Sequence, residues 1–102
     1  MRIIKKLTCL IDEELGDAEK YAKLALEYKD DHPTIAELFN SLSSEELKHM
    51  SYLHDAVVKL IAEHENDPDP RTEGMKLAHQ LLHERAIEKE KEVRILRSMF
   101  RE

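Results

Sequence analysis

The chain has 102 residues, of which 41% are hydrophobic and 37% are charged, and its formal net charge at pH 7 is −6. This length fits one domain with a modest core, and the apolar content argues against a disordered chain. The acidic balance argues against a nucleic-acid-binding protein, and no apolar run approaches the roughly 18 residues of a membrane span. Because Cys9 is the single cysteine and the first residues lack a signal-peptide pattern, we expect a cytoplasmic protein.

Two helices are predicted in the first two thirds of the chain. The first covers about residues 3–29 and stops at the segment KDDHP, because Pro33 disfavours helix at the residue before it. The second covers about residues 34–65. Its predicted start is a capping box, in which Thr34 is the N-cap and Glu37 reaches back to it.

A third helix is predicted over about residues 70–101. It follows the turn-forming segment NDPDP, in which Asp69 would be the N-cap and Pro70 the first helical residue. The fold class is therefore all-α. The simplest arrangement is an antiparallel helical hairpin with the third helix packed on it, in one domain over residues 1–102.

Both helices of the predicted hairpin carry polar residues in an apolar stripe. In the first helix the inward positions are Ile4, Leu7, Ile11, Glu14, Ala18, Tyr21, Ala25 and Tyr28. In the second helix they are Phe39, Leu42, Glu46, His49, Leu53, Ala56 and Leu60. A second register beside this one places Glu45 inward in place of Glu46. An unpaired charge among apolar residues is costly, so we expect these groups to have partners.

The polar groups also lie at one height along the hairpin. Counted from a turn centred on residue 31, Glu14 lies 17 residues before, Glu46 lies 15 after and His49 lies 18 after. With a rise of about 1.5 Å per residue, Glu14 falls between the other two. Glu-x-x-His places both side chains on one helix face, one turn apart. Carboxylates with an imidazole suit iron or manganese, with zinc as an alternative.

The same residues carry a family resemblance. Glu14 is followed seven residues later by Tyr21, and then comes the segment IAELFNSLSSEELKH. This pattern resembles the first helical hairpin of rubrerythrins, in the ferritin-like superfamily. The resemblance implies that Glu14 and Glu46 bind iron, Glu46 as a bridge between two ions, with His49 as a nitrogen ligand and Tyr21 beside the site. It also implies iron binding, with ferroxidase or peroxidase-like oxidation of Fe(II) by oxygen or peroxide.

The chain departs from that family in size. A ferritin-like di-iron domain has two such hairpins, whereas this chain has one Glu-x-x-His followed in chain order by no second copy. A two-fold partner can supply the missing half, as the similar encapsulated ferritins suggest, so that one dimer holds two ions. Alternatively, the third helix completes a smaller site. Glu88 has the matching height and shares a stripe with Glu84, which is less well placed.

Other interpretations remain open at this stage. The inward Glu and His groups also suit a buried polar network in a metal-free helical module that binds a partner or builds a scaffold. In the third helix, His79 and His83 have the i, i+4 spacing that can hold a divalent ion, whereas His54 is interpreted as a boundary residue. We expect a homo-oligomer built on a two-fold dimer, with the metal site at or near the two-fold axis.

Overall fold

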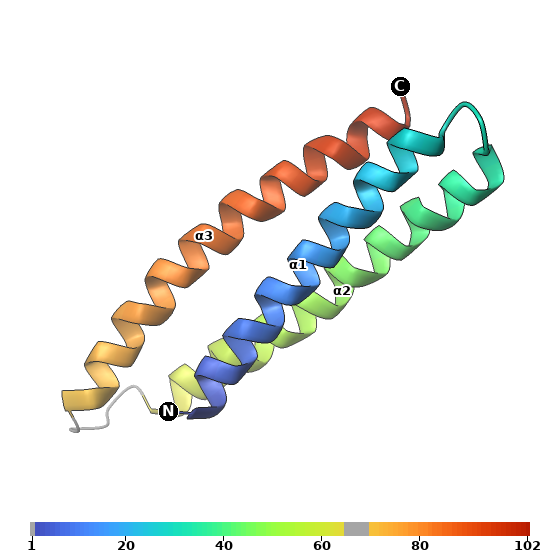
Figure 1. Cartoon of the computed structure of the whole chain (residues 1–102). Coiled ribbons are helices and arrows are strands. Elements are labelled where there is room, and N and C mark those ends of the chain that lie inside the picture. The colour runs from blue at the N-terminus through green and yellow to red at the C-terminus, as the bar shows by residue number, and fades with distance from the viewer. Residues whose placement is uncertain (1, 65–69) are drawn as a thin grey trace.

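The computed structural model describes residues 2–64 and 70–102 (Figure 1). It contains three long helices: α1 (Arg2–Tyr28), α2 (Pro33–Glu63) and α3 (Pro70–Phe100). These described ranges contain no strand, so the prediction of an all-α chain with three helices is confirmed. The predicted N-cap Asp69 lies outside the described residues. None of the helices, within the described part of the chain, is long and apolar enough to cross a membrane.

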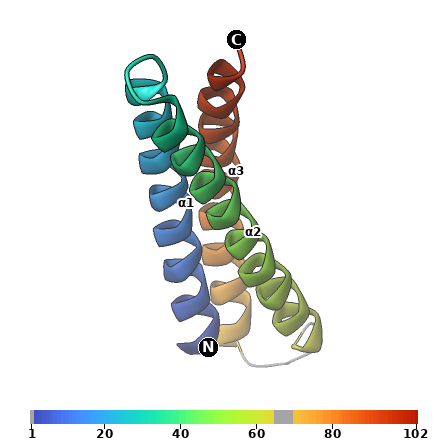
Figure 2. The same ribbon diagram turned by 90° about the vertical axis from the view of Figure 1, so that its right-hand side faces the viewer.

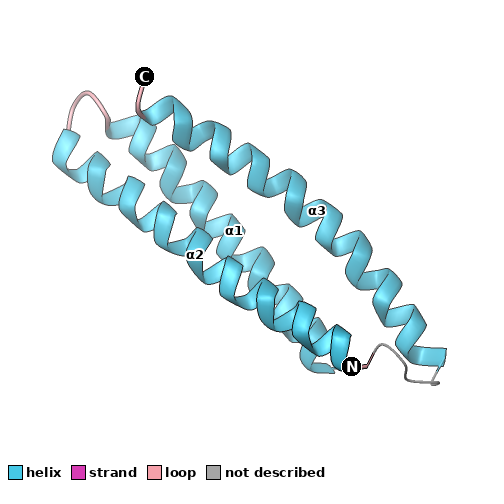
Figure 3. Cartoon of the chain, turned by 180° about the vertical axis from the view of Figure 1, so that it is seen from behind, coloured by secondary structure: helices cyan, strands magenta, loops and turns pink. Residues whose placement is uncertain are grey.

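The helices form an elongated bundle of 58 × 17 × 16 Å. α1 and α2 run in opposite directions and pack along much of their length, whereas α3 packs mainly on α1 and touches α2 very little (Figures 1 and 3). The N-terminus lies at the end where α2 finishes, and the C-terminus lies beside the turn between α1 and α2 (Figures 1 and 2). Lys29 of that turn donates a hydrogen bond to the carbonyl of Glu102, at 2.6 Å.

The start of α2 differs from the prediction. The helix begins at Pro33, its N-cap is His32, and no side chain caps it by a hydrogen bond. The predicted capping box of Thr34 and Glu37 is therefore wrong. Proline suits the first helical turn because its φ is fixed and it has no N–H to satisfy, so the helix starts one residue earlier. Glu37 pairs instead with Arg101, with Oε1 and Nη1 2.8 Å apart.

The buried stripe of α2 also differs from the prediction, by one residue. Its buried residues are Ala36, Asn40, Ser43, Leu47, Met50 and Val57. The more apolar stripe that we predicted to face inward is half-buried beside it, and His49 is exposed. Small side chains at Ala36 and Ser43 let α2 approach α1 closely, and close approach buries this stripe more deeply than the larger side chains would. Ser43 Oγ donates a buried hydrogen bond to the carbonyl of Ala18, at 2.7 Å.

The core of the bundle is one apolar cluster in which all three helices take part. Its buried members are Ile4, Ile11, Leu15, Ala18, Leu47, Met50, Val57 and Val93. Leu15 was predicted to lie outside the inward stripe of α1, yet it is almost fully buried, because α1 lies between two neighbours. A second cluster of Ala25, Ala36 and Phe100 closes the end of the bundle that holds the C-terminus.

Candidate metal centre

Glu14 of α1 meets Glu46 and His49 of α2 in a cluster that we call the Glu–His cluster. Each residue offers one ligand atom, and these atoms all lie within 4.8 Å of one another. His49 Nδ1 lies 3.6 Å from Glu14 Oε2 and 3.6 Å from Glu46 Oε2. The spacing of three between Glu46 and His49 turns both side chains to one helix face, and the short turn after α1 brings Glu14 to the same height.

The cluster has the form of an incomplete coordination sphere. Two ligands of one ion, each about 2.1 Å from it, lie roughly 3.0 to 3.5 Å apart, close to the separations seen between His49 and the two carboxylates. Glu14 Oε2 is buried and has no hydrogen-bond partner among the described residues. A buried oxygen that lacks a partner is costly, and a cation between these groups would satisfy it. The donor set therefore fits a divalent metal ion.

The electrostatics of Glu14 reflect this crowding. The pKa of Glu14 is raised to about 7, first because its protonated form can share a hydrogen bond with the nearby Glu46 carboxyl, and then because of burial and the negative charge of Glu46. His49 lowers the pKa of Glu14, but by less. Near neutral pH the carboxyl of Glu14 is thus held partly protonated. A bound cation would take the place of that proton.

The Glu–His cluster lies on the face of the hairpin that α3 leaves uncovered. α3 meets α1 at Glu19, whose Oε2 lies 2.8 Å from Lys89 Nζ, and it meets α2 at His54. Glu14 precedes Glu19 by five residues, and His49 precedes His54 by five. Five residues correspond to about 140° around a helix axis, so the cluster points away from α3 on both helices.

Apolar side chains also lie along this uncovered face. They are exposed or half-buried, and we call them the open face: Leu7, Leu10, Tyr21, Leu24, Ile35, Leu38 and Leu42. Ile35 and Leu38 are exposed to 47% and 52%. Tyr21, which the resemblance places beside the site, stacks on Phe39 with ring centroids 6.3 Å apart. The two carboxyls and the imidazole thus lie on a face that carries these apolar side chains as well as polar ones such as Asp17, whose Oδ1 lies 3.8 Å from Lys20 Nζ.

The remaining predicted ligands lie outside the cluster. Glu45 is exposed and is not among the residues that come within 4.8 Å of one another. Glu84 and Glu88 are exposed on α3, and Glu88 Oε1 lies 3.4 Å from Lys91 on its own helix. Within one protomer, the third helix therefore brings neither glutamate to the cluster.

The structure also shows a contact that the sequence pattern does not indicate. His54, interpreted above as a boundary residue, lies against His83, with His54 Nε2 3.1 Å from His83 Nδ1. The i, i+4 spacing of His79 and His83 was visible in the sequence. The pairing with His54 depends on where α2 and α3 approach each other, which no sequence period gives.

The chain was compared with protein-family models, with curated proteins and with solved structures, and no match was found.

Proposed function

We propose that this protein is a non-haem di-metal carboxylate protein of the ferritin and rubrerythrin type. Glu14, Glu46 and His49 from each of two protomers would hold two iron ions, with manganese or zinc as competing ions. The observation that carries the proposal is that three ligand atoms lie within 4.8 Å of one another, while the buried Oε2 of Glu14 among them makes no hydrogen bond to the described residues. The sequence resemblance to the rubrerythrin hairpin supports the same residues.

The chemistry of these residues suits a site that binds and releases a metal cation. Two carboxylates offset the charge of a cation, and an imidazole adds a nitrogen donor that does not add negative charge. Glu14 gives up its proton when a cation binds, so metal affinity rises as the pH increases through about 7. Bound iron would supply redox chemistry with oxygen or peroxide, which corresponds to the ferroxidase or peroxidase-like activity implied by the resemblance.

The two-fold dimer follows from the number of ligands and from the open face. One protomer offers three ligands, whereas a ferritin-like di-metal centre uses two hairpins that each contribute a glutamate and a Glu-x-x-His motif. A two-fold axis through the open face would double the set and cover the exposed Ile35 and Leu38. Because the glutamates of both copies would repel one another there, metal should strengthen the dimer and a chelator should weaken it.

A metal-free polar network is the second candidate, and one observation favours it. His49 Nδ1 lies at the same distance, 3.6 Å, from both carboxylates, so a protonated His49 can bridge them without an ion. In that case the hairpin would serve as a helical interaction or scaffold module.

Iron titration of matched variants separates the two candidates. Wild-type protein prepared without chelator should bind one Fe(II) per chain under anaerobic conditions. Glu46→Ala should abolish this binding and keep the helical circular-dichroism signal. Glu45→Ala is the matched control, because it removes an exposed carboxylate from the adjacent position. Loss of binding in Glu45→Ala alone would move the site to the second register, and a wild-type protein without stoichiometric iron would leave the polar network as the function of the cluster.

Sedimentation tests the dimer separately. Wild-type protein with iron or manganese should sediment as a dimer or a larger multiple of two. Leu38→Glu, which places a charge on the open face, should dissociate it. Leu81→Glu is the matched control on the outer side of α3, since Leu81 is exposed to 56%. A monomer at micromolar concentration with metal bound would refute the shared site.

A further inference from the structure

Three histidines gather between α2 and α3, on the side of the hairpin opposite the open face. We call His54, His79 and His83 the histidine cluster. The rings of His54 and His83 stack with centroids 4.6 Å apart, and His54 Nε2 lies 3.1 Å from His83 Nδ1. The ring of His79, one turn earlier on α3, stacks on His83 with centroids 5.8 Å apart.

One nitrogen of this cluster is buried without a partner. His79 Nδ1 makes no hydrogen bond to any of the residues that the structure describes, although it is shielded from solvent. Burial lowers the pKa of His79, and the nearby His83 and His54 lower it further. The imidazole is thus favoured in its neutral form, which is the form that binds metal ions.

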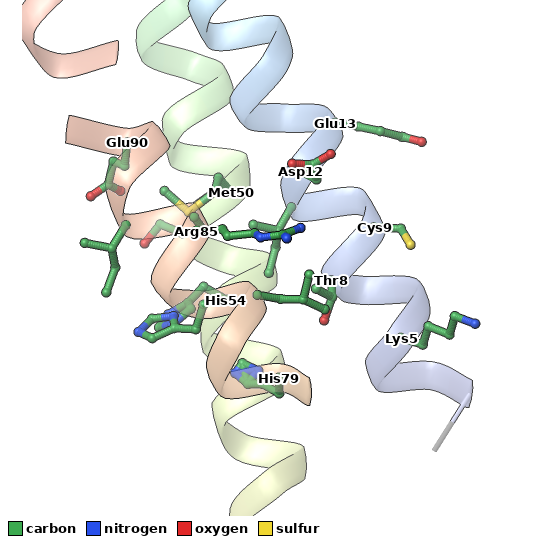
Figure 4. Close-up of a pocket in the computed structure, with 16 residues that line it drawn as sticks. Lys5, Thr8, Cys9, Asp12, Glu13, Met50, His54, His79, Arg85 and Glu90 are labelled. Atoms are coloured by element: carbon green, nitrogen blue, oxygen red, sulfur yellow. The ribbon is translucent and has the colours of Figure 1, made fainter. Parts of the chain in front are cut away.

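The histidine cluster borders a cavity of about 610 Å³ whose walls come from all three helices. Figure 4 shows His54 on α2 and His79 on α3 at one end of this cavity, with Asp12 and Glu90 farther along it. Cys9, by contrast, points away from the histidines. The basic side chains of Lys5 and Arg85 also line the cavity, so its charge is mixed and it is the histidines that favour a cation.

We propose that the histidine cluster is a second metal site, distinct from the Glu–His cluster, which takes a borderline divalent ion such as Zn²⁺ in a three-histidine set. Tetrahedral ligands about 2.05 Å from Zn²⁺ lie about 3.3 Å apart, so the 3.1 Å between the His54 and His83 nitrogens already has nearly the required span. Three nitrogen donors without a carboxylate favour Zn²⁺ over the harder ions that suit the Glu–His cluster.

Completing the site requires rotation of one ring. Among the described residues, only the Glu–His cluster brings three ligand atoms within 4.8 Å of one another. In the histidine cluster two nitrogens are in place, and the neighbouring ring of His79 must turn about its side-chain bonds to bring a nitrogen to them. Its Nδ1 has no hydrogen bond to the described residues that would oppose this turn. A fourth ligand position would remain open to water from the cavity.

Such an ion would fasten α3 to α2. These two helices touch very little, and α3 is held mainly by α1. A metal bound by His54 of α2 and by two residues of α3 would join them directly. Occupation of the site should therefore raise the melting temperature of the protein.

Co²⁺ is the probe that tests the proposal, because four-coordinate Co²⁺ has strong visible absorption. All variants would carry Glu46→Ala, so that failure of the Glu–His cluster cannot affect the result. In this background Co²⁺ should bind one equivalent per chain with a four-coordinate spectrum, and Zn²⁺ should displace it. His79→Gln and His83→Gln should each weaken binding by at least about tenfold, as expected for the loss of a direct ligand.

His64→Gln is the matched control. His64 also belongs to the α2 segment, but its Nδ1 lies 3.0 Å from the carbonyl of Leu60 and takes no part in the cluster. It should bind Co²⁺ like the parent. His79→Gln keeps the His54–His83 hydrogen bond, so it remains informative even if His83→Gln fails to fold. Unchanged affinity in His79→Gln, or a weak six-coordinate Co²⁺ spectrum in the parent, would overturn the three-histidine site.

Discussion

Replacing Glu14 with glutamine should change how the stability of the metal-free protein depends on pH. Glutamine has nearly the shape of the protonated acid and cannot ionise. The pKa of Glu14 is about 7 in the folded protein, against 4.5 for an unperturbed glutamate, because the Glu46 carboxyl and burial favour the protonated form. The folded state therefore binds more protons at this position than the unfolded state between these two values.

The sign and size of the change in the free energy of unfolding follow from this difference in proton binding. Where the folded state binds more protons, the free energy of unfolding falls as the pH rises. The contribution of Glu14 is therefore fully present below about pH 4.5 and is lost as the pH increases to about 7. The full difference corresponds to about 3 kcal/mol, at about 1.4 kcal/mol for each unit of pKa. The Glu14 side chain is 25% exposed, and solvent screening reduces the effect, so we expect about 2 to 3 kcal/mol in total.

Urea unfolding at a series of pH values between 5 and 8, with chelator present, measures this effect. The free energy of unfolding of Glu14→Gln minus that of the wild type should increase by about 2 kcal/mol across the series, because part of the change already falls below pH 5. Taking this difference cancels the contribution of His79, whose lowered pKa makes stability rise with pH. A difference that stays constant from pH 5 to 8, or that decreases, would refute the crowding of carboxyls in the Glu–His cluster.

Two further predictions concern the packing that supports the cluster. Ser43→Ala removes the buried hydrogen bond to the carbonyl of Ala18 and should lower the free energy of unfolding by about 1 kcal/mol. Ser43→Leu introduces a larger side chain between α1 and α2, so it should lower the free energy of unfolding further and also weaken iron binding. Urea unfolding and iron titration measure the two effects. Val93→Ala leaves a cavity at the fully buried contact of α3 with the core and should cost about 2 to 3 kcal/mol with iron binding kept. Iron affinity that is equal in Ser43→Leu and the wild type, or lost in Val93→Ala, would contradict the view that the α1–α2 contact supports the cluster and the α3 contact does not.

The proline-containing breaks in the sequence were sufficient for the number of helices, and helix periodicity was sufficient for the meeting of three polar residues. The spacing of three between Glu46 and His49 fixes their shared face, and a turn of four residues fixes the height of Glu14. Both inferences depend on helix geometry alone, which varies little between proteins.

The errors come from interactions between helices. The apolar pattern of α2 selected the stripe with the largest side chains, but the helices pack through the neighbouring stripe, where Ala36 and Ser43 are small. Periodicity cannot show which of two adjacent stripes faces a neighbour, because both have the same period. For the same reason the contact between His54 and His83 was not predicted. The capping box failed for a local reason, since Pro33 itself begins the helix.

The one-residue shift of the buried stripe bears directly on function. Had the predicted stripe been innermost, the His49 side chain would be buried. In the observed packing, the His49 side chain is 54% exposed and the carboxyls of Glu14 and Glu46 are at least three quarters buried. The two carboxylates thus form the buried part of the cluster, and the imidazole of His49 is its exposed part, on the side of the open face. In the proposed dimer, a second copy of the same face would offer both the apolar cover and the missing ligands.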